Sequence, residues 1–171
     1  MRVKDFLIVL VVMLFTSTSM AQEHNKNNDF PLKISGYFGL FHPIVTLQGT
    51  DITMNLEHAY TVGFVTGISF QKNVTYGYSL EIVPVIEATR HENKVKNVVI
   101  QPGVYFPLEK GWTLTNRLSF ETNGRYGITP SISKVLVKRN QTISVTVPFP
   151  VRFGNNNSIS VATGVLLTLS I

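Results

Sequence analysis

Six charged side chains within stretches of alternating polar and apolar residues are the first candidates for chemistry. They are Lys33, Glu81, Glu87, Arg117, Glu121 and Arg152. Each lies in the polar phase of its stretch, so all six would point to one side of a β-sheet. Because three positive charges meet three negative ones, the pattern favours a structural network of ion pairs and hydrogen bonds. A polar lining for a narrow conduction path is the alternative.

The histidines offer little for catalysis or metal binding. They are His24, His42, His58 and His91. The last three are expected near one another at the loop end, with Asp51, Glu57 and Glu92 close in sequence, but no spacing typical of metal ligands occurs. No histidine is followed two residues later by a serine, the arrangement of the small lipid A deacylases. We therefore predict no catalytic residues, no metal site, no cofactor and no enzyme activity.

One proline-rich stretch is distinctive, Pro148-Phe149-Pro150-Val151-Arg152-Phe153. A proline inside a strand removes a ladder donor, so this stretch predicts a bulge, a frayed strand end or a real break in the sheet. Pro84, Pro102 and Pro130 raise the same question elsewhere. A candidate binding surface is predicted here, without an identifiable ligand, from Pro148, Phe149, Pro150, Arg152 and Phe153.

The elements that must position these residues are strands, because a period of two dominates the chain from residue 32 onward. Eight segments are predicted: 32–41, 58–71, 76–89, 97–107, 112–122, 125–137, 142–153 and 158–171. In the last one, Ile159, Val161, Val165, Leu167 and Leu169 share one face. The opposite face of that segment carries mainly small residues. The sixth segment slips out of phase, which predicts a bulge near Ser133.

Whether the apolar faces of the strands point inward or outward distinguishes a soluble barrel from a transmembrane one. The polar faces consist mostly of Gly, Ala, Ser and Thr, which suit a crowded interior better than a solvated surface. The apolar faces carry many aromatic rings, too bulky for the interior of eight strands. Segments of ten or more residues match the length that crosses a bilayer at a tilt. We therefore predict an all-β protein, an eight-stranded antiparallel up-and-down transmembrane β-barrel with its apolar face outward. The longest loop is expected at about 42–57.

The first residues are typical of an export signal. Arg2 and Lys4 precede an uncharged apolar run over 6–15, and small residues lead to a predicted cleavage after Ala21. The predicted organisation is a signal peptide over 1–21, a short N-terminal tail over 22–31 and the barrel over 32–171. The chain has no cysteine, which excludes disulfides and a cysteine nucleophile. Its net charge of +5 is dispersed and predicts no nucleic-acid partner.

The export signal, the eight alternating segments and the alternating C-terminal strand resemble the small outer-membrane β-barrel proteins of Gram-negative bacteria. The last residue, Ile171, departs from the aromatic residue on which such barrels usually end. The resemblance implies a location in the cell outer membrane and contacts with its lipid, lipopolysaccharide and the barrel-assembly machinery. It also leaves room for an extracellular ligand.

These features together predict a non-enzymatic structural or surface-interaction role. A small channel or transport accessory is one alternative. A soluble exported β-barrel that binds a small apolar ligand is the other.

Overall fold

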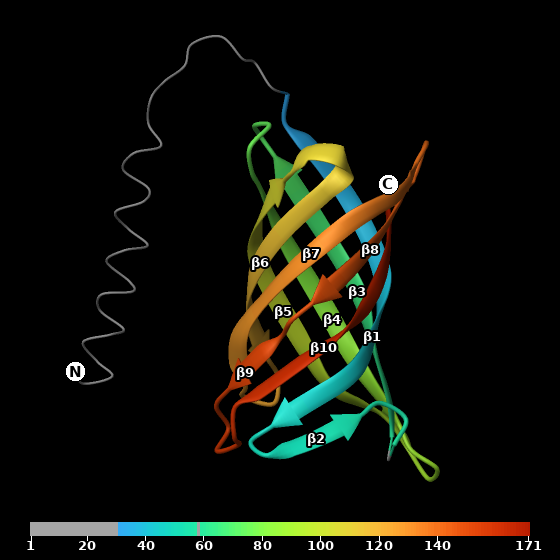
Figure 1. Ribbon diagram of the computed structural model, residues 1–171, viewed down its shortest axis with the longest axis vertical. Helices are drawn as coiled ribbons and strands as arrows, with labels where there is room; N and C mark the ends of the chain where they lie inside the picture. The colour runs from blue at the N-terminus through green and yellow to red at the C-terminus, as the bar shows by residue number, and fades with distance from the viewer. Residues whose placement is uncertain (1–30, 58) are drawn as a thin grey trace, which may run out of the picture.

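The computed structural model describes residues 31–57 and 59–171, which form one closed antiparallel barrel (Figure 1). Its strands are β1 (Lys33–Gln48), β2 (Asp51–Met54), β3 (Tyr60–Gln71), β4 (Gly77–Ala88), β5 (Asn93–Pro107), β6 (Trp112–Glu121), β7 (Tyr126–Lys138), β8 (Thr142–Pro148), β9 (Val151–Phe153) and β10 (Ser160–Ser170). A short 3-10 helix, η2, spans Glu109–Gly111. Within the described residues, no helix is long and apolar enough to cross a membrane. The predicted signal peptide, residues 22–30 of the predicted tail, His24 and His58 lie outside the described residues.

Ten strand labels correspond to eight positions around the barrel wall. β2 is a short hairpin partner of β1, and β8 and β9 follow one another between β7 and β10. The ring is closed by β1 and β10, which pair from Tyr37 with Ser170 to Gln48 with Ser160. The predicted eight-stranded antiparallel barrel is confirmed. Closure pairs every strand position of the ring with two neighbours, the condition for placing strands in hydrocarbon, whereas β2 lies outside the ring and pairs with β1 alone.

The two faces of the wall point in the predicted directions. Leu118 and Ser119 are neighbours on β6, yet Leu118 is 54% exposed and Ser119 is 0% exposed. The same alternation of exposed apolar and buried polar residues recurs on β10, where Leu167 is exposed and Thr168 is buried. A water-soluble barrel would have the reverse arrangement. The outer surface is therefore an apolar belt that fits a bilayer, and the soluble alternative is excluded by the direction of the faces.

One sequence prediction about local structure was wrong, and another was confirmed. The segment predicted as the longest loop, 42–57, is mostly strand, because β1 continues to Gln48 and turns into β2. A register shift between Pro43 and Val45 displaces the alternation, which hid this continuation. The bulge predicted near Ser133 is present slightly further along the strand, between Val135 and Val137. The long β1–β2 hairpin extends the end of the barrel opposite the short turns and η2 (Figure 1).

The proline-rich stretch is a real break in the wall. β8 ends at Pro148 and β9 begins at Val151. Across the break, the amide of Phe149 donates to the carbonyl of Pro130 at 2.8 Å, and the amide of Ala162 donates to the carbonyl of Pro150 at 3.0 Å. Single hydrogen bonds thus replace a continuous ladder here, because Pro148 and Pro150 have no amide hydrogen to donate.

Glycines inside the barrel make room for tyrosine rings. A Cβ on Gly67 would lie 2.3 Å from Tyr37 Cζ, whereas one on Gly36 would meet nothing closer than 3.8 Å. We expect Gly67→Val to displace the Tyr37 ring and to lower the free energy of unfolding by about 1–3 kcal/mol, the usual cost of overpacking. Urea unfolding in lipid vesicles measures this, with Gly36→Ala as the matched control. A Gly67→Val barrel as stable as the control would contradict the packing described here.

Candidate functional site

The middle of the barrel interior holds one ion pair. Arg117 on β6 places Nη2 2.7 Å from Glu81 Oε1 on β4, and the Tyr37 hydroxyl on β1 donates to the same oxygen at 2.9 Å. Both charged side chains are almost completely buried. Strands β1, β4 and β6 therefore contribute one residue each to a polar contact across the lumen. We call Tyr37, Glu81 and Arg117 the mid-barrel cluster.

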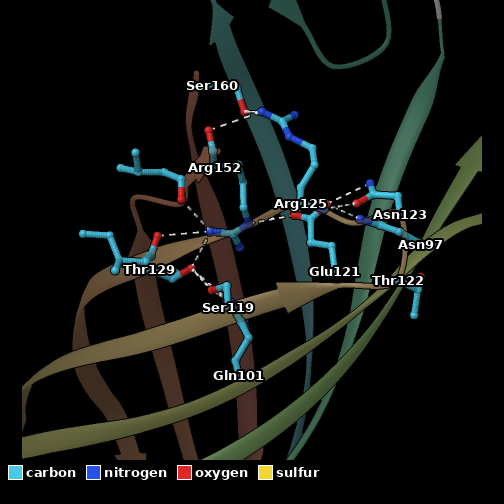
Figure 2. Close-up of polar contacts among 12 residues, drawn as sticks. Asn97, Gln101, Ser119, Glu121, Thr122, Asn123, Arg125, Thr129, Arg152 and Ser160 are labelled. Carbon is cyan, nitrogen blue, oxygen red and sulfur yellow. Dashed lines mark hydrogen bonds and ion pairs between the residues drawn. The ribbon is translucent and has the colours of Figure 1, made fainter. Parts of the chain in front are cut away.

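A second ion pair lies nearer the end that carries the β1–β2 hairpin. Arg152 Nε on β9 lies 2.7 Å from Glu121 Oε1 on β6. Arg152 Nη1 also donates to Thr129 Oγ1 at 3.0 Å (Figure 2). The other Glu121 oxygen accepts hydrogen bonds from the amides of Asn97 at 2.6 Å and Asn123 at 2.9 Å. These contacts satisfy a carboxylate and a guanidinium that would be costly to bury alone.

Gln101 on β5 connects the two ion pairs. In the amide orientation that satisfies its neighbours, its nitrogen donates to Glu81 Oε2 at 3.2 Å and its oxygen accepts from Arg152 Nη2 at 3.3 Å. The same oxygen accepts from Ser119 and Thr129. The interior polar groups therefore form one connected network rather than two separate ion pairs, and such networks hold their members in fixed positions.

The six charged residues singled out from the sequence do not all meet. Four of them form the two interior ion pairs. Glu87 lies at the rim, where it pairs with Lys96 and lies 4.0 Å from Lys94. Lys33 begins β1 at the opposite end and is exposed. The alternation of polar and apolar residues predicts that a side chain points inward, but it does not give the depth of that side chain along the barrel axis. The sequence therefore could not show that Glu87 and Lys33 lie apart from the other four residues.

The residues of the predicted binding surface point in two directions. Pro148, Pro150 and Arg152 line the interior, whereas Phe149 is 43% exposed on the outer face. The Phe153 ring lies 6.2 Å from the ring of Tyr126. The stretch is therefore not one continuous surface: its prolines and arginine face the lumen, and its phenylalanines follow the outward phase.

Between the mid-barrel cluster and the end that carries the β1–β2 hairpin, the interior widens into a cavity of about 460 Å³. Its walls differ in chemistry. Apolar side chains come mainly from β1, β3, β4 and β10, including Phe41, Val65, Val83, Val85 and Leu166. Polar side chains come mainly from β5, β6, β7 and β9, including Asn97, Gln101, Glu121, Thr129 and Arg152. The cavity is thus amphipathic, and its volume falls within the range of about 300–1,000 Å³ typical of small-molecule sites.

Sequence analysis missed Arg125, which lies in the turn between β6 and β7. Arg125 Nη2 reaches the start of β10 and donates to Ser160 Oγ at 3.0 Å (Figure 2). It also donates to the carbonyl of Ser158, just before β10, at 3.1 Å. The predicted segment 125–137 begins at Arg125, in the same polar phase as Thr129, so the alternation did contain a signal for this charge, although it was not among the six residues singled out. The structure places Arg125 in the turn because β7 begins at Tyr126.

The histidines are not gathered into a site within the described residues. His91 is exposed in the β4–β5 turn, and the ring of His42 lies 5.5 Å from that of Tyr60. Across residues 31–57 and 59–171, no group of three potential His, Asp or Glu ligands is placed to hold a metal ion.

The closed eight-position barrel, its exposed apolar belt and its polar interior define an outer-membrane β-barrel whose outer face contacts membrane lipid. No family model and no curated protein sequence matches the chain. Among solved structures, the outer membrane protein OprG from Pseudomonas aeruginosa is similar with 8% identity and a TM-score of 0.33, over 82% of this chain and 95% of that one. At this level of similarity, the assignment to the class rests on the geometry of the barrel itself.

Proposed function

We propose that this protein is a non-enzymatic, non-conducting outer-membrane barrel that serves in surface interaction. The observation that carries the proposal is the mid-barrel cluster, in which Arg117, Glu81 and Tyr37 bond to one another across the lumen. Gln101 joins this cluster to Arg152. A narrow lumen filled by hydrogen-bonded side chains is a poor path for ions. The cavity between these side chains and the β1–β2 hairpin is suited to holding a molecule at the cell surface.

The partners in this proposal follow from the two surfaces of the barrel. The apolar belt would contact the outer-membrane lipid, and the end with the β1–β2 hairpin would meet lipopolysaccharide and any extracellular ligand. The barrel-assembly machinery would insert the chain.

Conductance tests the proposal against its alternative, a small channel or transport accessory. We expect purified protein in a planar lipid bilayer to give no discrete current steps, because the bonded side chains of the two interior ion pairs and Gln101 occupy the lumen. A heat-dependent change of mobility on a gel would verify that the inserted protein is folded. Current steps in the native protein that change after substitution of Glu81, Glu87, Arg117 or Arg152 would establish the channel instead.

A further inference from the structure

The charges around the cavity are not balanced. Its lining includes four cationic residues, Lys96, Arg117, Arg125 and Arg152, and three anionic ones, Glu81, Glu87 and Glu121. Arg117 pairs with Glu81, Arg152 with Glu121 and Lys96 with Glu87. Arg125 is left over, and the cavity therefore carries one net positive charge. A charge enclosed by protein acts more strongly on a ligand than one in open water.

Arg125 has donors to spare. Its Nη2 donates only to the uncharged oxygens of Arg152, Ser158 and Ser160. No carboxylate of the described residues forms an ion pair with Arg125. Its Nε makes no hydrogen bond but is buried, so a ligand would have to bind at the outer nitrogens of the guanidinium. A planar guanidinium offers donors in a geometry that matches a carboxylate. Arg125 is therefore the group in this cavity most in need of an anionic partner.

The apolar wall defines the rest of the ligand. Val65, Val83, Val99 and Leu166 are buried and pack together, with Phe41 and Val85 against them. These residues give the cavity an apolar patch, which Glu81 and Glu87 flank on β4 and which lies beside the polar side chains of β6, β7 and β9. A molecule that fits both walls has one anionic end and a hydrocarbon body. The net charge of the cavity calls for a single negative charge on it.

We propose that the cavity binds a small amphipathic monocarboxylate, with its carboxylate on Arg125 and its hydrocarbon part against Val83, Val85 and Leu166. This inference rests on the proposed function, since it names the ligand class for a surface-binding barrel. The carboxylate gives the Arg125 guanidinium an anionic partner that the described residues do not supply, and the hydrocarbon part leaves water for an apolar surface. The mid-barrel cluster closes the inner end of the cavity and stops the ligand from passing through the barrel.

Octanoate is the probe, and the full barrel in lipid nanodiscs is the sample. Valine and leucine methyl NMR at pH 7.5 would follow Val83, Val85 and Leu166 in the cavity, and Leu118 on the outer face as a monitor of partition into lipid. We expect octanoate to shift the cavity methyl signals saturably without shifting those of Leu118. Octylammonium, which has the same chain length and the opposite charge, should bind at least about tenfold more weakly, a factor typical of losing one charge-assisted hydrogen bond.

Arg125→Gln should weaken octanoate binding by about tenfold or more, because the carboxylate loses a charge-assisted hydrogen bond. Arg90→Gln is the matched control, because it removes the same charge from an exposed turn at the same end and should leave binding unchanged. A heat-modifiability gel verifies that each variant is folded. If Arg125→Gln does not fold, Arg125→Lys keeps the charge but loses the planar fork, and should retain the preference for octanoate with lower affinity.

Equal binding of octanoate and octylammonium, or equal loss with both arginine variants, would overturn the carboxylate site while leaving a surface-binding barrel intact. Shifts confined to Leu118, or no shifts at all, would overturn the site as a whole. Current steps in the planar bilayer would overturn the proposed function instead, so the two failures are distinguishable.

Discussion

Arg117→Met is expected to destabilise the barrel by about 3–5 kcal/mol, the usual cost of removing one partner of a buried ion pair. Glu81 is only 3% exposed, and without Arg117 its carboxylate would keep Tyr37 and Gln101 as hydrogen-bond donors but lose its neutralising charge. Urea unfolding in phosphatidylcholine vesicles measures the loss. The single tryptophan, Trp112, at the start of β6, provides the fluorescence signal.

The double variant Glu81→Gln/Arg117→Met separates charge from packing. Glutamine still accepts the Tyr37 hydrogen bond but leaves no buried charge, so we expect most of the lost stability to return. Lys94→Met is the control, because Lys94 is half exposed and lies 4.0 Å from Glu87, and its removal should cost less than about 1 kcal/mol. If Arg117→Met is as stable as this control, water reaches Glu81, and the channel alternative gains support.

Ile82→Arg is expected to cost about 2–4 kcal/mol in a bilayer, the penalty measured for arginine on the lipid face of a barrel near the midplane. Ile82 lies in the middle of β4 and is 49% exposed on the apolar belt. In a soluble barrel, an exposed isoleucine could be replaced by arginine at little cost. The substitution therefore tests the membrane assignment directly, by folding yield and unfolding free energy in lipid vesicles.

Val74→Arg is the matched control for this substitution. Val74 is even more exposed, but it lies in the turn between β3 and β4, beyond the strands that form the belt. Near the interface, the cost of arginine falls to about 0–1 kcal/mol. Similar stabilities for Ile82→Arg and Val74→Arg would contradict a belt buried in hydrocarbon, because only depth in the bilayer distinguishes the two positions.

The sequence by itself determined the barrel, the number of its wall positions and the direction of its faces. Alternation is a local property: once a segment is a strand, each side chain must point to one face or the other. Leu118 and Ser119 show this most clearly, with the apolar residue outside and the small polar residue fully buried. The same logic placed Glu81, Arg117, Glu121 and Arg152 inside before any contact between them was known. It failed at Pro43–Val45, where a bulge shifted the phase unnoticed, whereas the slip at Val135–Val137 was visible in the sequence and predicted a bulge there.

Only the tertiary structure decided which interior residues meet. Arg117 pairs with Glu81, and Arg152 with Glu121, because the register and stagger of the closed sheet bring them to the same depth. The approach of Arg125 to Ser160 depends on the same closure. No local pattern contains this information, since depth along the barrel axis is set by all the strand pairings together, whereas the inward or outward direction of a side chain is set by its own strand alone.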